Sequence, residues 1–325
     1  MISRPFEWWI MKKEKSNKSS TEQSQDAYHI PVLLKEVVDG LSIRNKNGIY
    51  VDCTFGGGGH TKEILKHLSS DGRLVAFDQD PDAKQNLPSD ERIIFVPNNF
   101  RYLQRFLRLH RINEVDGILA DLGVSSHQFD EAERGFSTRF DADLDMRMDQ
   151  RQELKAFDIL NTYSEQQLHK LFEQYGEVTN SKTLARTIVE ARRSVNFKTI
   201  NSFKQAVGAI VKGNPNKYFA QVFQALRIEV NDELGALQDL LKQSVEVMKS
   251  GARIAIITFH SLEDRIVKNF FKKGHFESEE FIHPFEQSSP SPFKPINKKP
   301  IQPGTEEIKN NPRSRSARLR VAEKI

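Results

Sequence analysis

Residues 49–60 read IYVDCTFGGGGH, an apolar run that leads into four consecutive glycines. Its apolar half, Ile49 to Cys53, is typical of a buried strand, and the glycines predict a tight turn into a helix that opens near His60. Glycine lets the backbone approach a ligand closely, and the free N–H groups of a helix start favour an anion. The stretch therefore predicts one half of a nucleotide-cofactor site.

A second apolar run, Leu74 to Phe77, ends in Asp78, about twenty residues beyond the glycines. An acid at the tip of the neighbouring parallel strand can accept hydrogen bonds from both hydroxyls of a ribose. A turn that binds nothing needs only one or two glycines, and it does not explain an acid at this spacing. We therefore interpret the two runs together as a cofactor site.

Two classes of cofactor fit this pattern. Gly56 and Gly58 match the first two glycines of the G-x-G-x-x-G pattern of nicotinamide enzymes, but Thr61 stands in the third place. A dinucleotide lays a pyrophosphate on the helix start and favours that third glycine, whereas S-adenosylmethionine brings only one carboxylate. The turn favours S-adenosylmethionine as the cofactor. A nicotinamide-dependent oxidoreductase stays as an alternative.

Length and composition limit what surrounds the site. A chain of 325 residues is expected to hold two domains, and its single cysteine, Cys53, excludes a disulfide scaffold and a cysteine-based zinc site. Residues 1–26 are predicted to be a disordered N-terminal extension, because 12–26 are polar. The sequence contains no metal-ligand spacing and no apolar run of membrane-spanning length, so we expect a cytoplasmic protein without a metal.

Positive charge is concentrated in two segments. Residues 151–217 hold eleven Lys and Arg against six Asp and Glu, and residues 290–325 hold nine against three. Since the whole chain carries only +4, the remainder is acidic. This distribution indicates a polyanion bound on one face, and we expect a nucleic acid there.

Strand and helix patterns alternate over the first part of the chain. Strands are predicted at 49–53, 74–77, 93–96 and 115–120, and helices at 29–41 and 102–109. The alternation predicts an α/β fold with a parallel, doubly wound, Rossmann-like sheet. Ligands bind such sheets at the carboxyl ends of the strands, so Gly58, Asp78, Phe100 and Asp121 are expected to converge.

The alternation stops after residue 133. Residues 134–217 carry only helical patterns, including a capping box of Ser164 and Gln167, and a helical stretch over 219–248 leads to a further strand at 253–258. We therefore expect a discontinuous sheet domain, 27–133 and 218–325, interrupted by an inserted all-helical domain.

The end of the chain has three predicted parts. Ser261 with Asp264 is expected to cap a helix that follows the strand at 253–258. Residues 277–312 are rich in Pro, Ser, Asn and Lys and predict a long surface loop, and residues 317–321 predict a half-buried strand with Arg318 and Arg320 facing outward.

Several long motifs closely resemble one known family, and they occur in its order and approximate spacing. They are residues 52–60, Asp78, 121–128, 131–137, 144–149, 223–228 and 259–265. From about His29 to the final strand, the chain is similar to the bacterial cytosine-N4 methyltransferases of 16S ribosomal RNA (RsmH, formerly MraW). His127 stands where many members have proline, which is a departure in the loop rather than at the cofactor.

The resemblance implies transfer of a methyl group from S-adenosylmethionine to the exocyclic N4 amine of a decoding-centre cytosine in 16S ribosomal RNA. It implies direct in-line displacement. It places the cofactor contacts on Gly58, Gly59, His60, Asp78, Phe100, Asp121 and Gln128.

The chemistry at the methyl acceptor indicates fewer candidate residues than the cofactor site does. A cytosine amine is a poor nucleophile, so the enzyme must hold it in line with the methyl group and accept an N–H hydrogen bond. Candidate catalytic residues are Asp121, His260 at a strand tip, and Asp145 beside Arg147. Asp121 is followed by Leu122, not by the Pro-Pro-aromatic run of DNA amino-methyltransferases, and the resemblance favours cofactor binding for it. His260 and Asp145 have structural alternatives, as a hydrogen-bonding residue and as a loop brace.

The expected partner is 16S ribosomal RNA within the small ribosomal subunit, with no membrane and no DNA, and the chain is expected to be a monomer or a homodimer. A target base must leave its stack to reach a buried cofactor, and the basic helical insertion could hold the flanking phosphates. Candidate contacts are the basic Arg192, Arg193 and Lys198 and the aromatic Phe136, Phe140 and Tyr218. A non-catalytic assembly factor that binds ribosomal RNA stays as an alternative.

Overall fold

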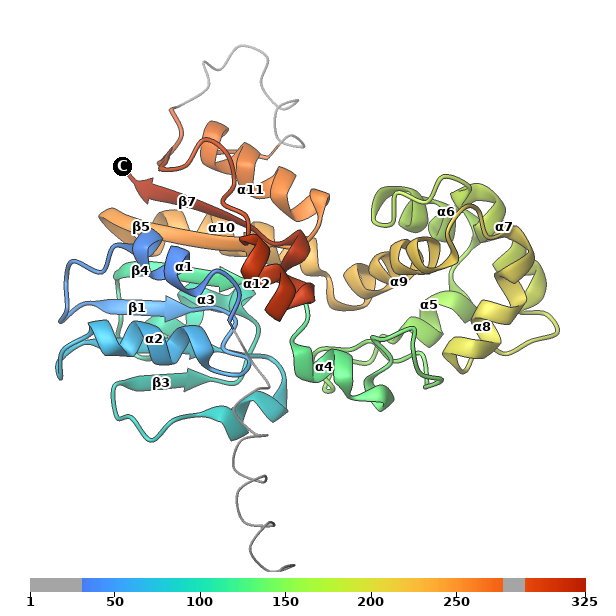
Figure 1. Ribbon diagram of the computed structural model, residues 1–325, viewed down its shortest axis with the longest axis horizontal. Helices are drawn as coiled ribbons and strands as arrows, with labels where there is room; N and C mark the ends of the chain where they lie inside the picture. The colour runs from blue at the N-terminus through green and yellow to red at the C-terminus, as the bar shows by residue number, and fades with distance from the viewer. Residues whose placement is uncertain (1–30, 277–289) are drawn as a thin grey trace, which may run out of the picture.

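The computed structural model describes residues 31–276 and 290–325. Within them the chain forms one sheet in the order β3-β2-β1-β4-β5-β7-β6 (Figure 1). The first five strands in this order are parallel, and β7 pairs antiparallel with both β5 and β6. The strands are β1 (Ile49–Asp52), β2 (Arg73–Phe77), β3 (Ile93–Val96), β4 (Val115–Asp121), β5 (Met248–Thr258), β6 (Phe293–Pro295) and β7 (Arg318–Lys324). The predicted doubly wound α/β sheet is confirmed. The prediction for residues 1–26 lies outside the described residues.

Helices cover both faces of the sheet because successive strand residues point to opposite faces. Val51, Val75 and Ile118 face one core, where they join apolar residues of α3 (Leu103–Leu109), α10 (Glu233–Val247) and α11 (Ser261–Lys273). Tyr50 and Leu74 face the other core, with α1 (Leu34–Leu41) and α2 (Gly59–His67). This sandwich holds the strand ends in fixed positions.

A third core lies beside the sheet, formed by helices between β4 and β5 (Figure 1). The helices are α5 (Ala156–Thr162), α6 (Glu165–Gln174), α7 (Ser181–Ala191), α8 (Ile200–Val207) and α9 (Pro215–Asn231). The predicted capping box is present in α6, where Ser164 Oγ accepts from Gln167 N–H and Gln167 Oε1 accepts from Ser164 N–H. None of the described helices is long and apolar enough to cross a membrane.

Two predicted helices have different limits. The helical stretch expected over 219–248 is two helices, because Asp232 adopts a left-handed φ of 46° between α9 and α10. The helix expected from His29 begins only at Leu34, after Leu33 with a φ of 54°, and His29 itself lies outside the described residues. Pro31 therefore precedes the helix.

The end of the chain corrects three predictions. The cap of α11 is His260, not Ser261, and Glu263 rather than Asp264 completes the capping box. The loop expected over 277–312 contains β6 and α12 (Thr305–Asn310) in its described part. Arg320 does not face solvent: it is buried and donates two hydrogen bonds to the Asp264 carboxylate, at 2.6 and 3.0 Å.

The Arg320–Asp264 pair yields a stability prediction. We expect Asp264→Ala to lower the free energy of unfolding by about 3 kcal/mol, because it leaves the Arg320 guanidinium buried without its counter-charge. Urea denaturation followed by circular dichroism measures this change. The exposed Asp71→Ala is the matched control, with an expected change below about 0.5 kcal/mol. Equal effects of the two variants would contradict the assignment.

Candidate functional site

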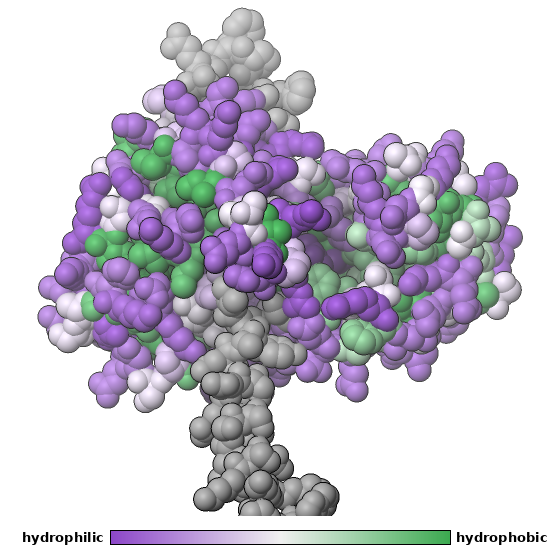
Figure 2. Space-filling model, viewed as in Figure 1, coloured by the Kyte–Doolittle hydropathy of each residue, from purple (hydrophilic) through white to green (hydrophobic). Residues whose placement is uncertain are grey.

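A cavity of about 570 Å³ opens at the carboxyl ends of the parallel strands. Figure 2 shows a recess in the largely hydrophilic surface between the sheet and the helices beside it. Seven of the residues singled out from sequence line the cavity: Gly59, His60, Asp78, Phe100, Asp121, Gln128 and His260. Two others, Gly58 and Asp145, are not among its described lining residues.

The glycine turn works through its backbone. Gly56 and Gly58 have left-handed φ values of 50° and 75°, which residues with a Cβ rarely adopt. A Cβ on Gly59 would lie 2.2 Å from the Pro31 ring, so this glycine permits close packing at the helix start. Gly58 therefore shapes the turn, while Gly56, Gly57 and Gly59 line the cavity.

Asp78 ties the end of β2 to this turn. Its carboxylate accepts from Gly56 N–H at 2.7 Å and from Asp80 N–H at 2.8 Å, one bond on each oxygen. Burial nevertheless raises the pKa of Asp78 to about 7, and the negative charges of Asp80 and Asp52 add to the effect. Each oxygen keeps a further lone pair for a ligand hydroxyl.

Asp121 ends β4 with a buried oxygen that lacks a partner. Its Oδ1 accepts no hydrogen bond from the described residues, and its Oδ2 lies 3.8 Å from His60 Nδ1. The pKa of Asp121 is raised to about 6, chiefly by burial and also by the nearby charges of Asp52 and Glu263, while His60 acts in the opposite direction. An acceptor left unpaired inside a cavity favours a hydrogen-bond donor on a ligand.

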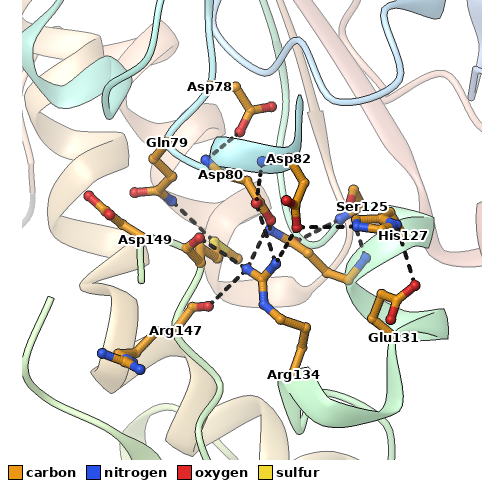
Figure 3. Close-up of polar contacts among 12 residues, drawn as sticks. Asp78, Gln79, Asp80, Asp82, Ser125, His127, Glu131, Arg134, Arg147 and Asp149 are labelled. Atoms are coloured by element: carbon orange, nitrogen blue, oxygen red, sulfur yellow. Dashed lines mark hydrogen bonds and ion pairs between the residues drawn. The ribbon is translucent and has the colours of Figure 1, made fainter. Parts of the chain in front are cut away.

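Figure 3 shows how the loop after β2 is joined to the loops after β4. Gln128 Nε2 and Arg134 Nη2 both donate to Asp80 Oδ2, at 2.8 and 2.9 Å. Arg134 Nη2 also donates to Met148 O at 3.1 Å. Gln128 therefore acts on the cavity wall partly through Asp80. Sequence reasoning missed Asp80 and Arg134 as site residues, although Arg134 lies in a motif that carries the resemblance.

Asp145 braces a loop. Its carboxylate accepts from Arg147 Nε and Nη2 at 2.7 and 2.8 Å, an ion pair outside the lining of the cavity. This geometry matches the structural alternative raised for Asp145. Of the three aromatic candidates, Phe136 and Tyr218 are buried in the third core, and Phe140 is 45% exposed.

A polar cluster lines the cavity beyond Asp121. Arg227 donates from Nε and Nη2 to the two oxygens of Glu233, at 2.8 and 3.0 Å. One carboxylate oxygen each of Glu233 and Glu263 and one imidazole nitrogen of His260, all atoms that could bind a metal ion, lie within 4.8 Å of one another. These residues come from α9, α10 and the β5–α11 junction, so no spacing in the sequence indicates the cluster; only the motifs at 223–228 and 259–265 point to parts of it.

Comparison with known proteins identifies the family. A model of the MraW methylase family matches residues 26–325. Similar curated proteins are each called ribosomal RNA small subunit methyltransferase H. That of Flavobacterium johnsoniae is 54% identical over 92% of this chain and 98% of its own length. The protein of Parabacteroides distasonis is 51% identical over 94% of this chain and 100% of its own length. The protein of Azobacteroides pseudotrichonymphae is 55% identical over 92% of this chain and 98% of its own length. The chain belongs to the MraW methylase family.

Proposed function

We propose that the protein transfers a methyl group from S-adenosylmethionine to the N4 amine of a cytosine in the RNA of the small ribosomal subunit. One observation carries the proposal: the ends of adjacent parallel strands bring the glycine turn, Asp78 and the unpaired Asp121 oxygen into one cavity. The relatives named as small-subunit RNA methyltransferases support the RNA substrate.

S-adenosylmethionine would use complementary groups in this cavity. Asp78 accepts from the ribose hydroxyls, and the exposed N–H groups at the glycine turn receive the carboxylate. Asp121 Oδ1 accepts from the amino group, whose positive charge stabilises the ionised aspartate. The cofactor supplies an electrophilic methyl group on sulfur. Burial of these carboxylates strengthens their attraction to a cationic ligand.

The helical part between β4 and β5 would position the RNA. Arg193 and Lys198 are exposed near the end of α7 and before α8. Arg192 differs from them, because its Nη1 donates to Tyr163 O at 2.6 Å and closes the end of α5. Arg193 and Lys198 are therefore the candidates for phosphate contacts, and Arg192 supports the fold.

Methyl transfer to small subunits tests the activity itself. Purified protein is mixed with subunits from cells that lack the modification and with tritiated S-adenosylmethionine, and the RNA is digested to nucleosides. We expect label in N4-methylcytidine. Label in another nucleoside would refute the cytosine assignment, and RNA binding without any transfer would favour the non-catalytic assembly factor.

The raised pKa of Asp78 predicts how binding of S-adenosylmethionine depends on pH. The ribose needs the ionised carboxylate, whose pKa is about 7 in the free protein, so wild-type affinity should rise from pH 6 to pH 8. Asp78→Asn should weaken binding about 10- to 100-fold and flatten this rise, because charged hydrogen bonds are lost. Isothermal titration measures both. Asp71→Asn is the exposed control, and a wild-type pH profile in Asp78→Asn would refute the role.

Charge reversal tests the RNA surface. Arg193→Glu with Lys198→Glu should weaken RNA binding and reduce the slope of log affinity against log salt by about two. The control reverses Arg44 and Lys46, which are exposed in the loop before β1, at the amino end of that strand and outside the cavity lining. If the control pair changes the slope as much as Arg193 and Lys198 do, the helical part is not the RNA surface.

A further inference from the structure

His260 is a buried side chain with an unsatisfied nitrogen. It lies between β5 and α11, lines the cavity, and its side chain is only 8% exposed. Its Nε2 is buried and makes no hydrogen bond with the described residues. The Glu263 Oε1 atom lies 3.2 Å away, in ion-pair contact with the ring, but it does not complete a hydrogen bond to Nε2. A buried polar atom of this kind calls for a partner from a ligand.

The cap of α11 decides which nitrogen of His260 carries the proton. As the N-cap, His260 Nδ1 accepts the backbone N–H of Glu263, at 3.5 Å. A neutral imidazole that accepts at Nδ1 carries its hydrogen on Nε2. The unsatisfied atom is therefore an N–H group that needs an acceptor, and His260 in this state is not a general base.

The hydrogen on His260 Nε2 also argues against a metal ion bound by Glu233, His260 and Glu263. Glu233, His260 and Glu263 have the spacing of metal ligands, but a metal would need a lone pair on Nε2. Moving the proton to Nδ1 would replace an acceptor by a donor at the N-cap and oppose the N–H of Glu263. In addition, both oxygens of the Glu233 carboxylate already accept hydrogen bonds from Arg227.

We infer that His260 Nε2–H donates a hydrogen bond to the ring nitrogen beside the amine of the target base. The inference rests on the proposed function, because it takes that base to be the methyl acceptor. Asp121 on β4 pairs with Ile257 on the neighbouring parallel strand β5, three residues before His260, and Asp121 and His260 both line the cavity. His260 therefore lies at the strand ends where the reacting amine must sit. His260 would thus orient the base while the methyl group transfers from sulfur to its amine nitrogen.

The same hydrogen bond selects among bases. In cytosine and adenine the amine adjoins an unprotonated ring nitrogen, which accepts from Nε2–H. In uracil the corresponding ring nitrogen carries a hydrogen, and this N–H would meet the His260 N–H donor to donor. A site built around one buried donor rejects a ligand that leaves it unpaired, and the discrimination exceeds what shape alone provides. His260 is therefore a specificity-determining residue.

Two substitutions separate this role from capping. Asparagine reproduces the position of Nδ1, so His260→Asn keeps the cap and removes the Nε2 donor. Glutamine reproduces the position of Nε2, so His260→Gln keeps a donor and loses the cap. His169→Asn is the matched control, on α6 and outside the cavity lining. Melting temperature, S-adenosylmethionine affinity, and kcat and KM on unmodified small subunits are measured for each.

We expect His260→Asn to keep the wild-type melting temperature and S-adenosylmethionine affinity while kcat/KM falls about 10- to 100-fold. His260→Gln should melt roughly 2 °C lower and yet retain more activity than His260→Asn. A capping role alone would reverse this order, with activity following stability, and would overturn the inference.

The remaining outcomes also decide. Wild-type kcat/KM in His260→Asn would overturn the inference and leave the proposed function intact, whereas an inactive wild-type protein would overturn the proposed function itself. Loss of S-adenosylmethionine binding in His260→Asn would show that His260 contacts the cofactor and not the base, and it would overturn the inference. Loss of wild-type activity in a chelator, restored by Mn²⁺, would place a cation in the cluster instead.

Discussion

The site depends on carboxylates crowded at adjacent strand ends without enough positive charge to balance them. Asp52, Asp78 and Asp121 follow or end β1, β2 and β4, and burial raises the pKa of all three, to about 7 for Asp78 and about 6 for Asp121. Hydrogen bonds from Thr61 to Asp52 and from Gly56 to Asp78 hold the group together. A cation bound between them would relieve this repulsion, and S-adenosylmethionine carries positive charge on its sulfur and its amine.

The rest of the molecule holds these strand ends in fixed positions. The two cores on the faces of the sheet set the strand register, and the Asp80–Arg134 pair joins the loop after β2 to the loops after β4. Arg134 also donates to the Met148 carbonyl, in the loop that leads into the helices between β4 and β5. This one side chain therefore connects the cavity wall at Asp80 to the helical part. We propose that RNA held by the helical part is thereby positioned relative to the methyl group.

Sequence reasoning predicted the glycine-turn half of the cavity because its signals are local. A glycine turn and an acid at the next strand tip define backbone shape and distance along a short stretch, and the sheet and the family are confirmed. The other half joins residues that are distant in the chain. The Arg227–Glu233 pair depends on the left-handed backbone at Asp232, a conformation that the sequence would signal only with a glycine. Arg320 on β7 pairs with Asp264 on α11, and no spacing in the sequence indicates this contact. The capping role of His260 was missed because Ser261 offered the commoner capping residue.

The decisive measurement is a crystal structure of the protein with S-adenosylmethionine or its demethylated product. We expect the ribose hydroxyls at about 3 Å from the Asp78 carboxylate, with the amino group on Asp121 and the sulfur turned toward the His260 end of the cavity. A ligand bound elsewhere, or a ribose that leaves Asp78 bonded only to Gly56 and Asp80, would contradict it.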